Sequence, residues 1–519
     1  MSKSDPFPGK DQVTFAEELN SFFTRFDKHD FSQERLDLKD QLISSLPPSD
    51  SDIEEIEEET VAKIFKGLNA RKATGPDGLS CRLLKTCSDQ LSRIFCFLFN
   101  WSLKDATVPT LWKTSIVCPV PKVAKPSILN DFRPNALTCV PMKCLEKCVL
   151  SRIKNQTSHV TDPLQFAYKH NRGTNDAIIT LLDHVYFHLE KPLSYARILY
   201  ADFSSAFNTV QPHLMAKKLI SLGVESRLNL WILDFLVNRT QFVKCHSVET
   251  GRTVFSSSRV TCTGTPQGTV VSPVIFTLYT DDCRSRMANI DLIKYSDDTA
   301  LVDCTNNDTD YQQAISDFSK WCDDNFLDFN VGKTKEMVID FRTSNQTDIP
   351  TLTIGGADVE RVQEYKYLGT IIDNKLNFNS NTDLINSKCQ QRLYFLRKLR
   401  SLDVSTSVLR TFYCSFIESV LTCSFICFYG GLSVQNKNKL NKVVNVSSKI
   451  VNERLSGLNE LYERRVRAKA VKIESDTSHI LASRYELLPS GRRFRTPKFK
   501  TIRTQKSFIP MSISLLNAN

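Results

Sequence analysis

The sequence predicts an α+β fold in which helices pack against a β-sheet and a mostly helical region follows. Between about residues 80 and 380, helical segments alternate with short runs rich in β-branched and aromatic residues, a pattern typical of helices packed on a sheet. After about residue 380 the pattern turns mostly helical. The chain has 519 residues, of which 41% are hydrophobic and 24% charged. It is therefore long enough for about two to four globular units.

The first 59 residues are interpreted as an N-terminal connector. Residues 1–48 mix apolar and charged side chains without a clear period, and an acidic run at residues 50–59 follows two prolines like a linker. A helix is expected to begin near Glu58, because apolar residues then recur at helical spacing. It should end before the turn-rich segment at residues 73–78, which contains two glycines and a proline.

The remaining elements are predicted from the same patterns. Residues 491–506 are basic with interleaved aromatic residues and are expected to be irregular. Strands are expected at residues 115–118, 198–200 and 336–341, and helices at residues 390–402, 407–430 and 438–451.

Composition argues against a secreted, membrane or zinc protein. The start of the chain is polar, with no secretory signal. The longest apolar stretch, Val420 to Tyr429, is too short to span a bilayer, so we expect a buried helix and no membrane partner. The sixteen cysteines are scattered without C-x-x-C spacing, which favours buried reduced thiols.

Charge is unevenly distributed along the chain. Residues 381–519 contain 24 Lys and Arg against 9 Asp and Glu, whereas the other residues contain 43 against 48. A basic C-terminal quarter beside a slightly acidic body suggests a polyanion-binding tail. A solvated, charged helical face explains the same counts equally well.

Three aspartates form the main candidate site. An apolar run delivers Asp202 at its end, and Asp297 and Asp298 lie between two apolar runs, as at the tip of a β-hairpin. Adjacent carboxylates in a partly buried site repel each other unless cations are bound. Together with Asp202 they could hold two divalent ions about 3.5–4 Å apart, the arrangement that in-line phosphoryl transfer uses. Oxygen ligands alone favour Mg²⁺.

A glycine-bounded loop at residues 264–273 lies between these aspartates in the sequence. Ser272 is expected to cap a following helix with Pro273 at its first position. Such a loop lets backbone and the Gln267 amide approach a ligand closely. Two other acidic pairs, Asp281-Asp282 and Asp323-Asp324, are expected to be exposed helix residues.

These segments resemble motifs of a known enzyme family. YADFSSAF, GTPQGTVVSP and YSDDTALV resemble the palm motifs of reverse transcriptases. KATGPDGLS, VPKVAKPSILNDFRPNALT and QFAYKHNRGTNDA resemble finger segments of LINE-type (non-LTR) retrotransposon enzymes, particularly the jockey-like group. WCDDNFLDFNVGKTKEMVIDF and EYKYLGTIID resemble two later palm motifs, and LLPSGRRFRTPKFKT resembles the C-terminal region. The resemblance runs from about residue 60 to the end.

The resemblance implies an RNA-directed DNA polymerase with a right-hand fold of fingers, palm and thumb and an antiparallel palm sheet. It places the fingers and palm at residues 60–379, a helical thumb at residues 380–470, and a basic nucleic-acid-binding tail at residues 471–519. Residues 1–59 remain the connector with its acidic linker.

The resemblance also assigns roles to single residues. Asp202, Asp297 and Asp298 match the catalytic metal ligands, which would hold two Mg²⁺ ions; structural turn carboxylates are the alternative. Phe207, five residues after Asp202, matches the steric gate, because a bulky ring under the sugar would clash with a 2′-hydroxyl. A core phenylalanine is the alternative there.

The nucleotide contacts are expected in the loops. Gln267 and Gly268 are expected at the incoming nucleotide, with plain loop structure as the alternative. Arg133 is a candidate triphosphate clamp because guanidinium binds phosphate bidentately, and Lys122 is a second candidate. Lys333 is a candidate to assist the leaving pyrophosphate. Exposed salt bridges or surface lysines are the alternatives at these positions.

The expected partners are template RNA, primer DNA and deoxynucleotides. The endonuclease domain that usually precedes this region is absent from the sequence, so an endonuclease acting in trans is expected. The family implies an intracellular location with nuclear and cytoplasmic phases. The residues expected to bind nucleic acid in the tail are Arg492, Arg493, Arg495, Lys498 and Lys500.

Some positions depart from the family pattern, and other functions stay open. Ser296 stands where alanine is usual, Asn208 where aspartate is common, and the segment QFAYKHNRGTNDA is loose apart from Gln165 and Gly173. An RNA-dependent RNA polymerase is one alternative, but Phe207 argues against it; a maturase would need a splicing domain that the sequence does not show. A decayed copy that only binds RNA is another alternative, against which the intact aspartates argue.

Overall fold

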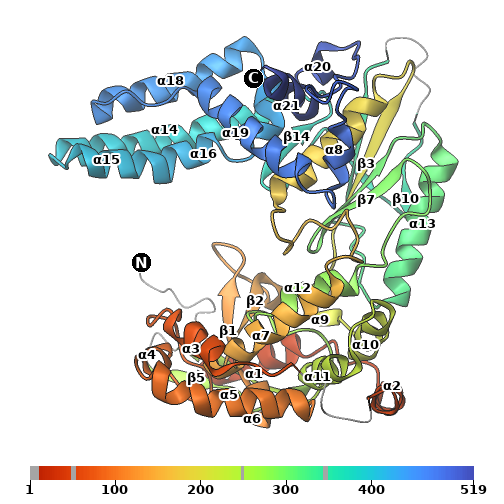
Figure 1. The fold of residues 1–519 in the computed structure, drawn as a ribbon, viewed down its shortest axis with the longest axis vertical. Coiled ribbons are helices and arrows are strands. Elements are labelled where there is room, and N and C mark those ends of the chain that lie inside the picture. The colour runs from red at the N-terminus through yellow and green to blue at the C-terminus, as the bar shows by residue number, and fades with distance from the viewer. Residues whose placement is uncertain (1–10, 48–53, 247–250, 343–348, 519) are drawn as a thin grey trace. The chain divides into compact units, whose positions relative to one another are not determined.

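The structure, a computed structural model, describes residues 11–47, 54–246, 251–342 and 349–518. The chain forms two compact units, each assembled from separate stretches of sequence. Unit 1 comprises residues 1–161, 204–282 and 322–328, and unit 2 comprises residues 162–203, 283–321 and 329–519. Figure 1 shows the elements coloured along the chain. The boundaries predicted at residues 60, 380 and 471 stay predictions.

Unit 1 packs helices around a five-stranded sheet with the order β2-β1-β4-β5, in which β6 also pairs with β4. β1 and β2 form an antiparallel hairpin, whereas β1 pairs with β4 in parallel. The strands are β1 (Ser115–Pro121), β2 (Phe132–Thr138), β4 (Arg239–His246), β5 (Thr253–Phe255) and β6 (Arg259–Thr261). The helices are α1 (Gln12–Phe23), α2 (Ser32–Ser44), α3 (Glu58–Lys66), α4 (Cys81–Thr86), α5 (Ser88–Lys104), α6 (Thr110–Lys113), α7 (Val140–Thr157), α9 (Ala206–Thr209), α10 (Pro212–Ser221), α11 (Ser226–Leu236) and α12 (Ser272–Tyr279).

The connector contains two helices, α1 and α2. α1 buries Phe15, Leu19 and Phe23 at four-residue spacing against β4, where they share a hydrophobic core with Val243. The expectation that residues 1–48 lack a period is therefore wrong for these helices, whose apolar stripe is what packs them onto unit 1. Part of the predicted acidic linker, residues 50–53, lies outside the described residues.

Unit 2 contains a five-stranded mixed sheet with β3 at its centre. The strand order is β12-β9-β3-β8-β7, and the β3–β8, β3–β9 and β7–β8 pairs are antiparallel while β12 and β9 pair in parallel. Two short antiparallel hairpins, β10–β11 and β13–β14, precede and follow β12 in the sequence. The strands are β3 (Tyr195–Ala201), β7 (Ile290–Tyr295), β8 (Asp298–Asp303), β9 (Lys335–Asp340), β10 (Thr353–Ile354), β11 (Ala357–Asp358), β12 (Glu360–Arg361), β13 (Glu364–Tyr367) and β14 (Thr370–Asp373).

A continuous hydrophobic core joins this sheet to the helices of unit 2. It includes Ile198 and Tyr200 of β3, Leu182 of α8, and apolar residues of α14, α18, α19 and α21. The helices are α8 (Thr174–His188), α13 (Asp308–Asp324, whose end counts to unit 1), α14 (Asn379–Ser401), α15 (Thr406–Phe412), α16 (Ser419–Leu421), α17 (Phe425–Phe428), α18 (Val434–Val451), α19 (Leu458–Glu474), α20 (Ile502–Gln505) and α21 (Phe508–Asn517).

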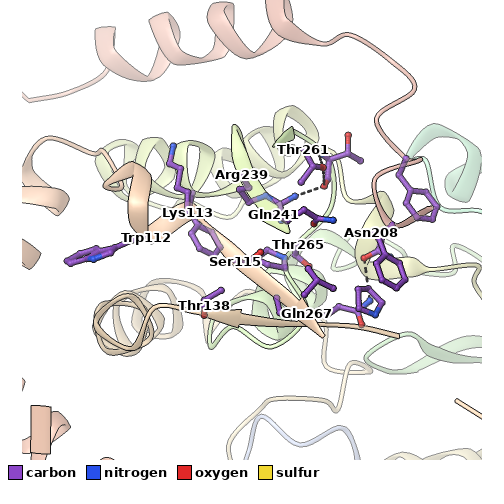
Figure 2. Close-up of a pocket in the computed structure, with 18 residues that line it drawn as sticks. Trp112, Lys113, Ser115, Thr138, Asn208, Arg239, Gln241, Thr261, Thr265 and Gln267 are labelled. Atoms are coloured by element: carbon purple, nitrogen blue, oxygen red, sulfur yellow. Dashed lines mark hydrogen bonds between the residues drawn. The ribbon is translucent and has the colours of Figure 1, made fainter. Parts of the chain in front are cut away.

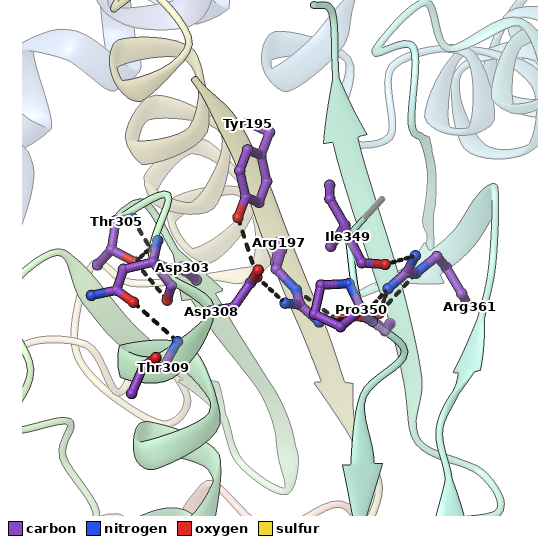
Figure 3. Close-up of polar contacts among 11 residues, drawn as sticks. Tyr195, Arg197, Asp303, Thr305, Asp308, Thr309, Ile349, Pro350 and Arg361 are labelled. Carbon is purple, nitrogen blue, oxygen red and sulfur yellow. Dashed lines mark hydrogen bonds and ion pairs between the residues drawn. The ribbon is translucent and has the colours of Figure 1, made fainter. Parts of the chain in front are cut away.

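A buried ion-pair network fixes the start of β3 (Figure 3). The Arg197 side chain is 2% exposed and donates to Glu336 Oε1 from Nε at 2.8 Å and from Nη2 at 2.6 Å. Its Nη1 donates to Asp308 at 2.7 Å, and Glu336 also accepts from Arg361 at 2.9 Å. Because removing one partner leaves an uncompensated buried charge, the network holds β3 against its neighbour β9.

Residues Thr406–Gly431 form a helical stretch with the length and composition of a membrane-crossing helix, half of it buried inside the protein. It is longer than the apolar run Val420–Tyr429 singled out in the sequence. A π-helical turn at Tyr413–Glu418 interrupts it, and Leu409, Ile417 and Phe425 belong to the core of unit 2. Packing within this core accounts for its apolar character.

The main secondary-structure predictions are confirmed. Residues 115–118 and 198–200 fall in β1 and β3, residues 336–341 match β9 except for the last residue, and a helix, α3, begins at Glu58. The predicted helix at residues 390–402 matches α14 except for its last residue, and the one at residues 438–451 falls within α18. The predicted helix at residues 407–430 is broken into α15, α16 and α17. The α+β class is confirmed in its coarse form, with antiparallel and mixed sheets.

Candidate active site

The sheet of unit 2 places the three predicted aspartates at the same end of its central strands. β3 pairs with β8 antiparallel up to Ala201 and Thr299, so Asp202 and Asp298 occupy the next positions of the two strands. β7 and β8 pair up to Tyr295 and Asp298, which leaves Ser296 and Asp297 as the turn of the hairpin. The predicted strand end and hairpin tip are both confirmed.

The charges of Asp202 and Asp297 act on the Asp298 carboxylate. Although Asp298 is exposed, the surrounding protein desolvates its carboxylate, and this burial raises its pKa to about 6 together with the negative charges of Asp297 and Asp202. A carboxyl next to like charges resists ionisation unless a cation compensates it. Within the described ranges, no three His, Cys, Asp or Glu side chains are grouped closely enough to hold a metal ion.

Asp202 is fixed by the turn before β9. Its backbone N–H donates to Thr334 Oγ1 at 3.3 Å, and its carbonyl accepts from the Asn330 N–H at 2.9 Å. The Lys333 ammonium lies 3.8 Å from Asp202 Oδ2, with 65% of the lysine side chain exposed. The structure thus brings Lys333 to the aspartate site, in an ion pair too exposed to contribute much stability.

A cluster of tyrosines lies under the aspartates, and the sequence analysis gave these residues no role. Tyr365 of β13 stacks on Tyr200 of β3 with ring centroids 4.1 Å apart. Burial, then the charges of Asp298 and Asp202, raises the pKa of Tyr365. Tyr365 is therefore a neighbour of the site, and its place in the motif-like segment EYKYLGTIID is the signal that could have identified it.

The glycine-bounded loop of unit 1 is built onto helix α9. The N–H groups of Thr265 and Gly264 donate to the carbonyls of Phe207 and Val210, each at 2.7 Å. The Phe207 ring stacks on Phe276 of α12, with ring centroids 4.6 Å apart. This arrangement brings the predicted gate and the loop into one structural element.

Gln267 and Gly268 attach this loop to strand β2. The Gln267 carbonyl accepts from the Ala136 N–H at 2.7 Å, and its Nε2 donates to Asn208 Oδ1 at 3.3 Å. Gly268 has φ +116°, and a Cβ there would lie 2.7 Å from the Ala136 carbonyl oxygen. Glycine is required because both the conformation and the space exclude a side chain.

The two predicted phosphate-binding cations lie on the β1–β2 hairpin. Arg133 is exposed on β2, opposite Val120 of β1. Lys122 is also exposed, and its Nζ donates to the Asn130 carbonyl at 2.7 Å. The hairpin thus presents Arg133 to solvent and ties Lys122 to its own loop.

The part of the chain that carries the three aspartates and the glycine-bounded loop is similar to known proteins. Residues 120–372 match the family model described as reverse transcriptase (RNA-dependent DNA polymerase). These residues are therefore similar to a reverse transcriptase domain. A second model, described as the N-terminal region of the alkylated DNA repair protein alkB homolog 8, matches residues 378–419, which form α14 and α15 and extend to the π-helical turn.

The similar proteins belong to mobile elements. The chain is 25% identical over 469 residues to the RNA-directed DNA polymerase from mobile element jockey of Drosophila melanogaster, covering 84% of this chain and 48% of that protein. It is 28% identical over 337 residues to the jockey protein of Drosophila funebris, covering 62% and 35%. It is 24% identical over 458 residues to the probable RNA-directed DNA polymerase from transposon BS of Drosophila melanogaster, covering 85% and 49%.

These matches confirm the resemblance to jockey-like non-LTR reverse transcriptases. The chain spans about half the length, or less, of the curated relatives that it matches. The residues that match the reverse transcriptase model include Asp202, Asp297 and Asp298. The roles of single residues stay predictions.

Two buried charged residues that the sequence analysis missed support the glycine-bounded loop of the reverse transcriptase domain. Arg239 lines a narrow pocket of about 50 Å³ behind this loop (Figure 2). It donates from Nη2 to the carbonyls of Thr263 and Gly264, at 2.5 and 2.9 Å, and burial lowers its pKa to about 10. No local sequence pattern marks Arg239, since its contacts with the loop are to backbone atoms 24 and 25 residues further along the chain.

Glu146 is the second buried charged residue. Its Oε2 accepts from the N–H groups of Val270 and Val271, and burial raises its pKa to about 7. The predicted Ser272 cap is wrong by one position, because Val271 is the N-cap and Ser272 is the first helical residue. The Glu146 carboxyl therefore holds the two loop residues that lead into α12.

Of the other acidic pairs, Asp281 and Asp282 are not helix residues, because both follow the end of α12 at Tyr279. Asp323 and Asp324 are exposed at the end of α13, as predicted. Asp282 is exposed, but Asp281 is buried in the turn after α12 and is not an exposed helix residue.

The predicted basic tail is packed into unit 2. Phe508, Ile509 and Ile513 of α21 belong to its hydrophobic core, so only part of the tail is irregular. Glu190, which follows α8, accepts from the Thr501 and Thr504 hydroxyls. Residues 491–500, called the basic loop below, precede Thr501, and their Lys and Arg side chains are exposed. Its cations are Arg492, Arg493, Arg495, Lys498 and Lys500.

Proposed function

We propose that this chain is an RNA-directed DNA polymerase of a non-LTR retrotransposon, which extends a primer 3′-hydroxyl with deoxynucleotides on an RNA template. One observation carries the proposal: Asp202 follows the end of β3 next to the β7–β8 hairpin that carries Asp297 and Asp298, within residues that match the reverse transcriptase model. The mutual charge effect on the pKa of Asp298 supports their proximity.

We propose that Asp202, Asp297 and Asp298 hold two Mg²⁺ ions. Three carboxylates provide the oxygen donors that this ion prefers, and their mutual repulsion leaves negative charge that a divalent cation would compensate. Once bound, two such ions lower the pKa of the attacking hydroxyl and stabilise the charge on the triphosphate. The Lys333 ammonium, beside Asp202, would neutralise charge on the departing pyrophosphate.

The nucleotide-binding residues are proposed to come from unit 1. The α9–loop element supports this role, because it presents the Phe207 ring and the Gln267 amide from a backbone that buried Arg239 and Glu146 hold in place. Phe207 would exclude the 2′-hydroxyl of ribonucleotides. Arg133 would bind the triphosphate with its guanidinium fork, with Lys122 as a weaker contact.

In this proposal the units supply the parts of a right-hand polymerase. The mixed sheet of unit 2 corresponds to the palm, the β1–β2 hairpin and its helices to the fingers, and α14 to α19 to the thumb. The sheet order with β3 at its centre supports the palm assignment, because β3 and its neighbour β8 then carry their aspartates at the same end of the sheet.

Nucleic acid is proposed to be held mainly through its phosphates, with the basic loop as one contact. Its five exposed cations support this role, since phosphate neutralisation dominates such binding and makes it salt-sensitive. Nuclear and cytoplasmic phases are proposed from the retrotransposon assignment alone. An endonuclease acting in trans stays a prediction.

Primer extension tests the function. Wild type, Asp297→Asn and, as a control, the exposed Asp324→Asn are compared on an RNA template with a DNA primer, deoxynucleotides and Mg²⁺. We expect extension by wild type and by the control, and none by Asp297→Asn. Tight binding of RNA without any incorporation by wild type would refute the polymerase and leave an RNA-binding protein.

A further inference from the structure

A short segment of unit 2, residues 162–167, runs along the strand that leads into the Asp297–Asp298 turn. The Lys294 N–H donates to the Leu164 carbonyl, and the Phe166 N–H donates to the Lys294 carbonyl, both at 2.9 Å. The Lys294 ammonium lies 2.8 Å from Asp162 Oδ2, with both side chains almost completely buried. This segment, called the strap below, is therefore fixed to β7 by its backbone and by a buried ion pair.

The side chain of Gln165, in the middle of the strap, reaches the turn itself. Gln165 is 1% exposed, and its Oε1 accepts from the Ser296 N–H at 3.1 Å and from the Ala167 N–H at 3.0 Å. Both neighbours are backbone donors, so the orientation of the amide is determined by its partners. Ser296 has φ +62°, a left-handed conformation that side chains other than glycine rarely adopt. Gln165 thus holds the strained residue that precedes Asp297.

The nitrogen of the Gln165 amide, unlike its oxygen, makes no hydrogen bond with the described atoms. Among the described atoms, Gln165 Nε2 is buried and has no hydrogen-bond partner, and the same holds for Ser296 Oγ. A buried donor without a partner destabilises a fold. The position therefore keeps a glutamine for what its oxygen does at the turn, and an apolar side chain of the same shape would remove that unsatisfied donor.

The strap is also anchored at its far end. Arg172, just after it, forms an ion pair with Asp476 at 2.5 Å. Asp176 of α8 accepts from Lys469 and from His479 Nε2, the latter at 2.9 Å. These contacts tie the chain that follows Gln165 to the C-terminal part of unit 2, so Gln165 approaches the turn from a rigid support.

We propose that Gln165 is a positioning residue, which sets the backbone of the Ser296–Asp297 turn and through it the placement of the Asp297 and Asp298 carboxylates. This inference rests on the proposed function for its meaning in catalysis. Gln165 touches neither substrate nor metal; it acts through the Ser296 N–H. Its removal should loosen the carboxylate pair and reduce the rate of the chemical step, while nucleotide affinity changes little.

Three variants test the proposal. Gln165→Met keeps the shape and removes both accepted hydrogen bonds, whereas Gln165→Glu keeps an oxygen that can accept them. Asn381→Leu is the matched control: Asn381 is 3% exposed, its Oδ1 accepts from the Ile371 N–H at 3.1 Å, and its Nδ2 has no partner among the described atoms. The control therefore removes the same kind of bond from another hairpin of unit 2.

Amide hydrogen exchange of a peptide covering residues 294–299 is measured in metal-free protein, and primer extension gives kcat, KM for the deoxynucleotide and the half-saturating Mg²⁺ concentration. For Gln165→Met we expect faster exchange, a kcat lower by about tenfold or more and a higher Mg²⁺ requirement, as for other residues that orient metal ligands. KM should stay within about twofold, because the nucleotide contacts are proposed elsewhere. Gln165→Glu should restore slow exchange and part of kcat, and Asn381→Leu should leave both unchanged.

The proposal is overturned if Gln165→Met exchanges at the wild-type rate across residues 294–299. It is equally overturned if kcat and the Mg²⁺ requirement match those of Asn381→Leu. Should wild type fail to polymerise at all, the proposed function falls, but the exchange comparison still decides whether Gln165 holds the turn.

Discussion

Replacing Asp298 with asparagine should stabilise the metal-free protein at neutral pH while abolishing nucleotide incorporation. Burial and the charges of Asp297 and Asp202 raise the pKa of Asp298 from 3.8 to about 6. That difference corresponds to about 3 kcal/mol, and solvent screening of this exposed side chain reduces it to about 1 kcal/mol. For a unit of this size, the gain should raise Tm by about 2 °C.

The sign of the pH dependence follows from the raised pKa. Between about pH 4 and pH 6 the folded protein binds more protons at Asp298 than the unfolded chain does, so stability falls as pH rises through this window. The full penalty is present above about pH 6. Asparagine carries no charge, and its advantage over aspartate should be complete at pH 7.5 and smaller at pH 4.5.

Thermal unfolding in EDTA at the two pH values measures this advantage. Asp324→Asn, which removes an exposed carboxylate at the end of α13, controls for the general effect of one charge. Two results would contradict the mutual repulsion of the three carboxylates. One is an Asp298→Asn variant less stable than wild type at pH 7.5, and the other is a gain in stability that does not depend on pH.

Three further outcomes are expected. Arg197→Met should destabilise the protein by about 3 kcal/mol, because it leaves the buried Glu336 carboxylate with less compensating charge. In denaturant unfolding, the Arg197→Met/Glu336→Met double variant should lose less stability than Arg197→Met alone. An equal loss in both variants would refute the network. Phe207→Ala should raise ribonucleotide relative to deoxynucleotide incorporation by about tenfold in single-nucleotide extension, and an unchanged ratio would exclude the gate. Changing three arginines of the basic loop to alanine should weaken RNA binding and reduce the slope of log affinity against log salt by about 2, whereas an unchanged slope would make the loop an ordinary solvated surface.

The basic loop has to be tested by substitution rather than by deletion. Removing residues 485–519 would take away Phe508 and Ile513, which are buried in the core of unit 2. The loss of affinity would then be confounded with unfolding.

Local pattern was sufficient for the strands and for the aspartates at their ends. An apolar run followed by Asp202, and two apolar runs around Asp297 and Asp298, predict a strand end and a hairpin tip because side chains alternate along strands. The antiparallel register that places Asp202 next to Asp298 is a long-range property. It follows from the pairing of β3 with β8, which no single segment encodes.

The missed residues share a physical reason. Arg239 and Glu146 bind backbone groups distant along the chain, and Gln165, which the resemblance singled out without a role, does the same at Ser296. Such contacts depend on the finished fold and leave no periodic trace, so sequence patterns give them no signal. Helix α1 is different, because Phe15, Leu19 and Phe23 do recur at helical spacing and could have been recognised.

The most direct test of the central claim is a crystal structure of the protein with primer–template, a deoxynucleotide and Mn²⁺, using the anomalous signal of the metal. The account predicts two peaks about 3.5–4 Å apart, each bound by carboxylates of Asp202, Asp297 or Asp298. Metal peaks elsewhere, or an Asp202 carboxyl that stays more than about 10 Å from the other two, too far for shared two-metal coordination, would contradict it.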